Sequence, residues 1–246
     1  MQLQRRVVVT GLGILSPIGN SKDTAWLNCI NGVNGITEVD FGIADCPVTV
    51  GGKLKDLDLE NLIPSKLSRR IDPFVQYGII SANEAIKDSH LNESDIKNKK
   101  IGVSMGSGIG GLQSIELNHN NLNDRGFKKV SPFFVPGSIV NMTSGLISIE
   151  HGFKGPNSSI VTACSSGSHC IGFAARSIAY GDADIMIAGG SEMASTPLGI
   201  AGFLASKALS KNSDPESASR PWDKDRDGFV LSDGAGAIVL EEYEIC

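Results

Sequence analysis

Cys164 is the residue of this sequence best suited to covalent chemistry. It lies between an apolar segment at 159–163, which is expected to be a β-strand, and a run of small residues expected to begin a helix. A thiol reacts as its thiolate, and a helix N-terminus favours that anion through its dipole and its free N–H groups. The same N–H groups can stabilise a developing oxyanion. The alternative is a buried structural cysteine, because an unpaired cysteine packs like a small hydrophobic side chain.

The sequence around Cys164 resembles the active-site signature of the β-ketoacyl synthase family. The matching segment, 155–167, reads Gly-Pro-Asn-Ser-Ser-Ile-Val-Thr-Ala-Cys-Ser-Ser-Gly. Further family motifs follow one another in similar order and spacing along essentially the whole chain, at 6–13, 106–111, 131–136, 220–223, 227–231 and 233–236. The pattern is most similar to the condensing enzymes of type II fatty acid synthesis.

The resemblance implies an acyltransferase that works in two steps without a cofactor or a metal. Cys164 would accept an acyl group from acyl carrier protein as a thioester. Malonyl-acyl carrier protein would then lose carbon dioxide, and the resulting carbanion equivalent would attack the thioester. The product would be a 3-oxoacyl chain on its carrier, extended for fatty acid elongation.

The second step depends on groups that this sequence does not contain. In the family, two catalytic histidines, a lysine and a Gly-Phe-Gly loop with the second oxyanion amide lie in a further, C-terminal half. None of His90, His119, His151 and His169 lies in a matching motif, and His169 is expected to be packed or hydrogen-bonded locally. Since loss of one oxyanion donor typically lowers a rate by ~10²–10³, we expect little or no condensation by this polypeptide alone.

The resemblance also assigns residues to the acyl tunnel and to carrier docking. The tunnel residues are aliphatic, aromatic or small: Ile109, Phe134, Ala163, Gly199 and Phe203. Ile109 matches the position that gates chain length, and such a lining suits a saturated or monounsaturated chain.

Basic residues lie where the family docks its acidic carrier protein: Lys66, Arg69, Arg70, Lys128, Lys129 and Lys207. The alternative for each is ordinary solvated charge. The resemblance favours docking for the pairs at 69–70 and 128–129. Such contacts would raise the association rate more than the affinity and would weaken with salt.

Two motifs suggest ligands that their context does not support. Gly106-x-Gly108-x-x-Gly111 matches a dinucleotide fingerprint, but the polar segment at 117–126 replaces the second strand and acidic residue that the fingerprint requires. Asp223-x-Asp225-x-Asp227 begins like a calcium loop, yet position twelve is glycine and no flanking helices are evident. We expect the second motif to be a turn braced by Arg220 and Arg226.

Alternating apolar runs and helical patterns predict an α/β fold with a mixed, largely parallel sheet between helices. Strands are expected at 6–10, 101–105, 159–163, 185–188 and 237–241. Ser21 and Asp72-Pro73 are expected to begin helices. After Cys164, a stripe of Ile171, Ala174, Ala175 and Ile178 predicts a deeply buried helix that Gly181 ends, with Cys170 in the core.

The resemblance implies the N-terminal half of the thiolase-like fold over residues 1–246, with the C-terminal half absent. The segments at about 33–70 and 112–157 have weak periodicity and would form the cap over the substrate channel and part of a dimer contact. A half-fold would leave apolar faces without their partner, which predicts poor solubility or pairing with another chain.

The composition is the one expected of a cytoplasmic protein. Five scattered cysteines without metal-ligand spacing are typical of a reducing compartment. No charged segment precedes an apolar run at the N-terminus and no apolar run approaches membrane-spanning length, so neither a signal peptide nor a membrane partner is expected. A net charge of −5 and a pI near 5.4 argue against nucleic acid as a partner. The resemblance implies a homodimer.

Three alternatives to an elongating condensing enzyme remain at this stage. The chain could be a non-catalytic half-domain that pairs with a separate C-terminal chain or docks acyl carrier protein. It could be a fragment of a polyketide ketosynthase, although modular ketosynthases usually occur in very long multidomain chains. Thiolases place their cysteine much earlier and use coenzyme A.

Overall fold

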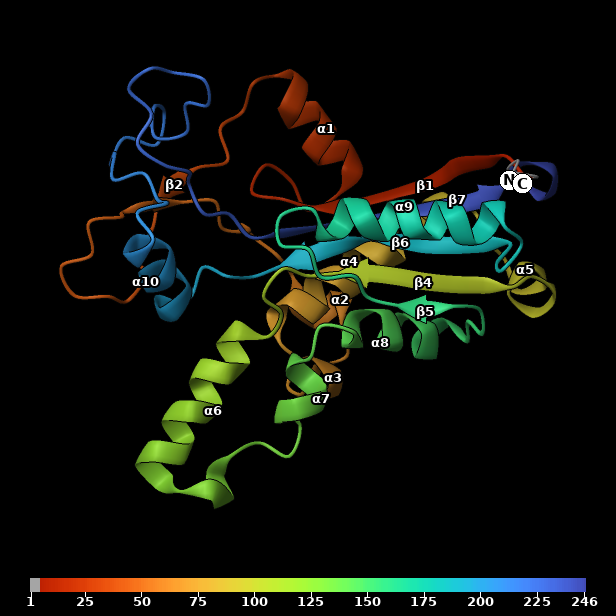
Figure 1. Ribbon diagram of the computed structural model, residues 1–246, viewed down its shortest axis with the longest axis horizontal. Coiled ribbons are helices and arrows are strands. Elements are labelled where there is room, and N and C mark those ends of the chain that lie inside the picture. Colours follow the sequence, from red (N-terminus) through yellow and green to blue (C-terminus); the bar gives the residue numbers. More distant parts are fainter. Residues whose placement is uncertain (1–4) are drawn as a thin grey trace.

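A five-stranded mixed sheet forms the centre of the computed structural model, which describes residues 5–246 (Figure 1). The strands, in spatial order, are β1 (Val7–Leu15), β7 (Gly234–Glu242), β6 (Ile185–Glu192), β4 (Ile101–Gly106) and β5 (Asn157–Ser158). β4 pairs in parallel with β5 and β6, whereas β7 runs antiparallel to both β1 and β6. The expected mixed sheet is confirmed, with parallel pairing confined to the half that contains β4.

Helices cover both faces of the sheet, because the strand residues that point to either face are apolar. In β6, Ile185 and Ile187 belong to one buried cluster, while Met186 and Ala188 belong to another on the opposite face. Helices α4 (Pro73–Asp88) and α8 (Met142–His151) cover the first face. Helix α9 (Ser166–Ala179) lies along the second face (Figure 1).

The expected helix starts at Ser21 and Asp72 are confirmed. The Ser21 side chain accepts a hydrogen bond from the Thr24 N–H and caps α1 (Lys22–Ile30). The Asp72 carboxylate caps α4 through the Phe74 N–H, with proline at the first helical position. Helix α4 packs so closely on β1 that a Cβ at Gly13 would overlap the Ser81 carbonyl oxygen.

The segment at 33–70 is mostly irregular and contains short elements: β2 (Thr37–Glu38), β3 (Val50–Gly51), α2 (Leu59–Leu62) and α3 (Ser65–Ser68). The segment at 112–157 is more helical than its weak periodicity predicts and contains α6 (Leu112–Arg125), η1 (Phe127–Lys129), α7 (Phe134–Ser138) and α8. Helices α6 and α7 extend away from the carboxyl end of β4 (Figure 1). The remaining elements are α5 (Glu93–Asn98), α10 (Pro197–Ala205) and η2 (Tyr243–Ile245).

The prediction of a strand over 159–163 is wrong. Strand β5 ends at Ser158, whose register partner on β4 is Ser104. At the next position the Ser159 hydroxyl donates to the Met105 carbonyl, the group that a continued ladder would offer to a backbone N–H. The apolar residues that follow therefore form an extended approach to Cys164 and not a sheet strand.

None of the helices over residues 5–246 is both long enough and apolar enough to cross a membrane.

Candidate active site

Cys164 is exposed and lies one residue before Ser165, the residue that caps the N-terminus of α9. The preceding residue, Ala163, has a φ of 51°, in the left-handed region that residues other than glycine seldom occupy. This sharp turn presents the thiol at the beginning of the helix. The alternative of a buried structural cysteine is therefore wrong for Cys164.

Ser166 holds this turn from inside the protein. Its buried hydroxyl donates to the Ala163 carbonyl at 2.7 Å and accepts from the Thr162 N–H at 2.9 Å. Within residues 5–246, the N–H of Cys164 donates to no protein acceptor, so it is available to a substrate oxyanion. The backbone on both sides of the thiol is thus bonded, while the N–H at the thiol itself is left free.

Glycines bring the cysteine turn close to the sheet. A Cβ at Gly106, the last residue of β4, would lie 2.6 Å from the Ile160 carbonyl oxygen and 2.9 Å from Cys170 Sγ. A Cβ at Gly190 would lie 3.0 Å from Gly167 Cα. Cys170 is fully buried, as expected. Substitution of these glycines would therefore displace the start of α9 from the carboxyl ends of β4 and β6.

His169 makes the local contact expected from the sequence. Its Nδ1 lies 2.7 Å from the Thr162 hydroxyl, on the far side of the turn. His119 lies near Asn123, and His151 stacks on Phe153. His151 Nε2 also lies 2.8 Å from Asn83 Oδ1 on α4, whereas the side-chain contacts of His119 and His169 are with residues close in sequence.

The glycine loop after β4 holds a carboxylate from the protein itself. Glu192, the last residue of β6, accepts hydrogen bonds from the Ser107 hydroxyl and from the N–H groups of Gly108, Ile109 and Gly110, at 2.6–3.3 Å. The N–H groups that a dinucleotide phosphate would require are therefore already used. This arrangement agrees with the sequence argument against a nucleotide site. Glu192 was not among the residues selected from the sequence, where the local signal is only an acidic residue at the end of an apolar strand.

The structure brings together some of the five predicted tunnel residues and not others. The loop that carries Ile109 lies beside Ala163, since a Cβ at Gly108 would be 3.4 Å from the Ala163 carbonyl oxygen. Ile109 is 41% exposed. Gly199 is buried at the contact between α10 and Leu112, and the Phe203 ring packs edge-on against the Phe229 ring.

Phe134 lines a hollow of about 740 Å³ between the α6–α7 segment and the main body, and its place in an acyl tunnel stays a prediction. Two of the predicted docking residues, Arg69 and Arg70, line the same hollow. The Arg70 guanidinium lies 4.4 Å from the centroid of the Phe133 ring. All six predicted docking residues are exposed: Lys66, Arg69, Arg70, Lys128, Lys129 and Lys207. Their role in docking stays a prediction.

Buried acidic groups shape the floor of this hollow. Asp233 accepts hydrogen bonds from the Ser195 hydroxyl and from two backbone N–H groups, and burial raises the pKa of its carboxyl. Burial, together with the charges of Asp233 and Asp72, raises the pKa of Tyr77 to about 12. The phenol of Tyr77 is therefore uncharged throughout the physiological range.

The acidic motif at 223–227 forms a braced turn. Arg226 Nη1 donates to the Asp223 carbonyl at 2.8 Å, and Arg220 pairs with Asp227 at 3.5 Å. Asp227 also accepts from the Ser210 hydroxyl, and these hydrogen bonds lower the pKa of its carboxyl. In the described part of the chain, no group of three or more His, Cys, Asp or Glu side chains could hold a metal ion.

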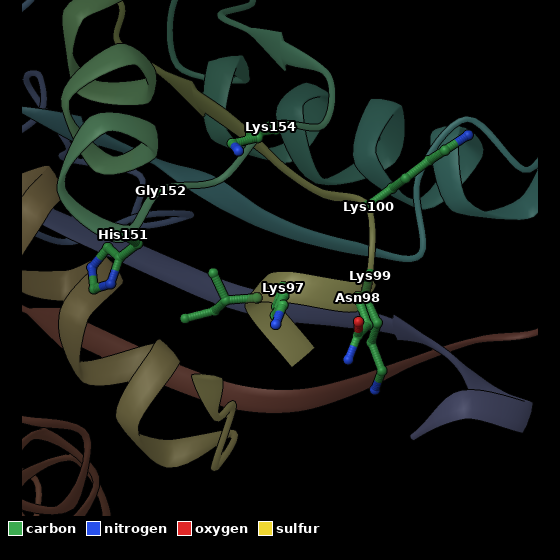
Figure 2. Close-up of a pocket in the computed structure, with 8 residues that line it drawn as sticks. Lys97, Asn98, Lys99, Lys100, His151, Gly152 and Lys154 are labelled. Atoms are coloured by element: carbon green, nitrogen blue, oxygen red, sulfur yellow. The ribbon is translucent and has the colours of Figure 1, made fainter. Parts of the chain in front are cut away.

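A second hollow, of about 610 Å³, lies at the opposite end of β4 (Figure 2). Since β4 has six residues, this hollow is roughly 20 Å from the Cys164 end of the sheet. It is lined by lysines, but Figure 2 shows Lys99 and Lys100 pointing in different directions. Lys99 is also paired with Asp95 at 2.9 Å. The lysines do not converge on one anion, so we assign no role to this hollow in the chemistry of Cys164.

Residues 4–245 match the family model for the β-ketoacyl synthase N-terminal domain. The chain belongs to the β-ketoacyl synthase family. Among curated relatives, the 3-oxoacyl-[acyl-carrier-protein] synthase 2 of Vibrio cholerae is 54% identical over 243 residues, and that of Coxiella burnetii is 50% identical over the same length. Each alignment covers 98% of this chain and 59% of the relative. The chain thus spans about three fifths of the length of these synthases.

Solved structures agree with this assignment. A β-ketoacyl synthase from Burkholderia phymatum matches with a TM-score of 0.89 at 28% identity, over 98% of this chain and 60% of that chain. A type II PKS acyl-carrier protein in complex with its ketosynthase matches with a TM-score of 0.85 at 29% identity, over 98% of this chain and 59% of that chain. The expected fold class, the N-terminal half of a ketosynthase, is confirmed.

Proposed function

We propose that this chain supplies the acyl-accepting nucleophile of a 3-oxoacyl-[acyl-carrier-protein] synthase of fatty acid elongation. The observation that supports the proposal most strongly is the exposed Cys164 at the start of α9, with a free backbone N–H beside it. The thiolate attacks the carbonyl carbon of an acyl thioester, and the N–H of Cys164 stabilises the oxyanion. The carrier thiol then leaves and the acyl group remains on Cys164.

Condensation requires the remaining part of the family's site. Decarboxylation of malonyl-acyl carrier protein needs histidines that stabilise the enolate, and the four histidines of this sequence have the local contacts described above or lie outside matching motifs. The chain alone therefore transfers acyl groups to itself and performs little or no condensation. A non-catalytic role as a half-domain remains the alternative, and it fails if Cys164 is acylated.

The outer face of α9 supports the presence of a second half in the active enzyme. His169, Gly172, Phe173, Arg176 and Tyr180 are all exposed and share one side of the helix. Phe173 and Tyr180 are 41% and 43% exposed, although both belong to a helix whose other side is buried in the core. A helix whose aromatic residues face outward is expected to pack against a further layer.

The partner that delivers the acyl group is acyl carrier protein, and the assembly is a homodimer located in the cytoplasm. One matched structure is described as an acyl-carrier protein in complex with its ketosynthase, which supports carrier docking in this family. The exposed basic residues at 66–70 and 128–129 supply positive charge near the hollow that contains Phe134. The 54% identity to the 3-oxoacyl-[acyl-carrier-protein] synthase 2 of Vibrio cholerae, against 29% to a type II PKS ketosynthase, favours a fatty acyl substrate.

The proposal is tested by the intact mass of the purified chain after incubation with an acyl-loaded carrier protein. One acyl adduct is expected in the wild type and in Cys29→Ala, which removes an exposed thiol located away from the N-terminus of α9. The Cys164→Ala variant should acquire none. An adduct that survives Cys164→Ala, or no adduct on folded protein, would rule out the proposed role of Cys164.

A further inference from the structure

We propose that Glu192 is a positioning residue that fixes the loop at 107–110 and thereby sets the acyl-length selectivity of the Cys164 site. The selectivity part of this inference rests on the proposed function. The positioning part rests only on contacts between Glu192, the loop and the cysteine turn.

The contacts concentrate on one carboxylate. Glu192 Oε2 accepts from the N–H of Gly108 at 2.6 Å and of Ile109 at 3.0 Å. Glu192 Oε1 accepts from the Ser107 hydroxyl at 2.9 Å and from the Gly110 N–H at 3.3 Å. The whole loop is therefore organised around the end of β6. Because Ile109 is exposed, its side chain is held mainly through its own backbone and not by surrounding core residues.

The loop sequence suits a carboxylate and little else. A Cβ at Gly108 would lie 2.8 Å from Glu192 Oε2, so a side chain there would push the carboxylate away. Gly110 has a φ of 80°, which favours glycine, and its N–H is shared between Ser107 Oγ at 3.1 Å and Glu192 Oε1 at 3.3 Å. Within residues 5–246 no lysine, arginine or histidine forms a salt bridge with Glu192, so the backbone and Ser107 supply its stabilising hydrogen bonds.

Glutamine replaces this acceptor only in part. A carboxylate has two acceptor oxygens, whereas a carboxamide has one oxygen and an NH₂ group that donates only. In Glu192→Gln an NH₂ group on the side of Gly108 and Ile109 would meet two N–H donors. An NH₂ group on the other side could donate to the Ser107 hydroxyl, but it would leave the Gly110 N–H with only Ser107 Oγ as its acceptor. Hydrogen bonds to a charged acceptor are also stronger than those to a neutral one.

The same network reaches the cysteine turn. Ser107, which donates to Glu192, is buried, and its carbonyl oxygen lies 3.5 Å from the Ser166 hydroxyl, whose proton goes to the nearer Ala163 carbonyl at 2.7 Å. That hydroxyl also holds the backbone of Thr162 and Ala163 next to Cys164. Loosening of Glu192 therefore changes the distance between Ile109 and the thiol, which is the space that the first carbons of an acyl chain would occupy.

The matched control is Glu84→Gln. Glu84 also accepts two backbone N–H bonds, from Ile14 at 2.9 Å and from Lys22 at 2.7 Å, but it lies on α4 and contacts neither the loop nor the cysteine turn. Glu192→Gln and Glu84→Gln thus remove the same kind of interaction at two places. The milder Ser107→Ala removes one donor and leaves the carboxylate in place, which provides a second variant if Glu192→Gln does not fold.

The experiment combines amide hydrogen exchange with acylation of Cys164 by hexanoyl- and hexadecanoyl-carrier protein. In Glu192→Gln the amides of 108–110 should exchange about tenfold faster or more, because each loses a charged acceptor. In Glu192→Gln the ratio of the two acylation rates should change severalfold. Glu84→Gln should alter neither the amide exchange of 108–110 nor this ratio. Ser107→Ala should give a smaller change in the same direction.

Unchanged exchange at 108–110 in Glu192→Gln would overturn the positioning role. Faster exchange with an unchanged rate ratio would overturn the role in selectivity. If wild-type Cys164 is not acylated by either carrier protein, the proposed function fails, and the exchange measurement still decides whether Glu192 fixes the loop.

Discussion

Replacement of Gly172 by alanine tests whether the outer face of α9 is free in this chain and covered in a complete synthase. Gly172 lies in the interior of the helix, and no atom lies within 4 Å of the position its Cβ would take. Alanine is favoured over glycine in a helix interior by about 1 kcal/mol. For a protein of 246 residues, a gain of this size raises the melting temperature by about 2–4 °C.

The assay is thermal unfolding of wild type and Gly172→Ala in two contexts. One is this chain alone, and the other is the chain fused to the part of the Vibrio cholerae relative that the alignment leaves uncovered. The gain should appear in the chain alone and vanish or reverse in the fusion, because an added layer would meet the new methyl group. Gly202→Ala in α10 is the control, since that position is also open and should respond equally in both contexts. An equal gain from Gly172→Ala in both contexts would refute the reasoning.

The other predictions concern the cysteine turn, two titrating groups and carrier docking. Ser166→Ala should lower the free energy of unfolding by about 1–3 kcal/mol, because it leaves the Thr162 N–H without its acceptor. Chemical denaturation measures this loss, and a loss of less than about 0.3 kcal/mol would contradict the role of the hydroxyl. In an alkaline absorbance titration Tyr77 should ionise near pH 12, and since the fold favours the neutral phenol, stability should fall as pH rises above about 10. Tyr77→Phe should remove that late step. Burial lowers the pKa of His151, so the fold favours the neutral imidazole and stability should decline as pH falls below about 6.5; urea midpoints across pH 5–8 should flatten in His151→Phe. The double substitution of Lys128 and Lys129 by alanine should slow acylation of Cys164 by acyl carrier protein severalfold at low salt. Alkylation of Cys164 by a small reagent should keep its rate. Equal slowing of acylation and alkylation would exclude docking at these lysines.

Local patterns of the sequence were sufficient for the helix starts and for the core. Ser21 and Asp72 cap the helices expected from them, because a capping side chain acts on the N–H groups two or three residues ahead. Cys170 is buried because it shares a face with the small apolar residues of α9. These features depend on neighbours within one or two helical turns.

The strand expected at 159–163 shows where local patterns fail. Val161 is apolar and β-branched, as in a strand, but it is exposed, because Ser159 bonds the last carbonyl available on β4 and Ala163 turns the chain. Those contacts come from a strand more than fifty residues earlier in the sequence, which no local periodicity reports.

The sequence by itself determined the family, the nucleophile and the sheet-and-helix framework, since the motif around Cys164 and the apolar periods are written in neighbouring residues. Only the tertiary structure decided that the thiol is exposed and that its glycine loop is organised by Glu192. The physical reason is that a carboxylate finds its donors through space. Glu192 is more than eighty residues from the loop after β4, and only parallel pairing of β4 and β6 places their ends side by side.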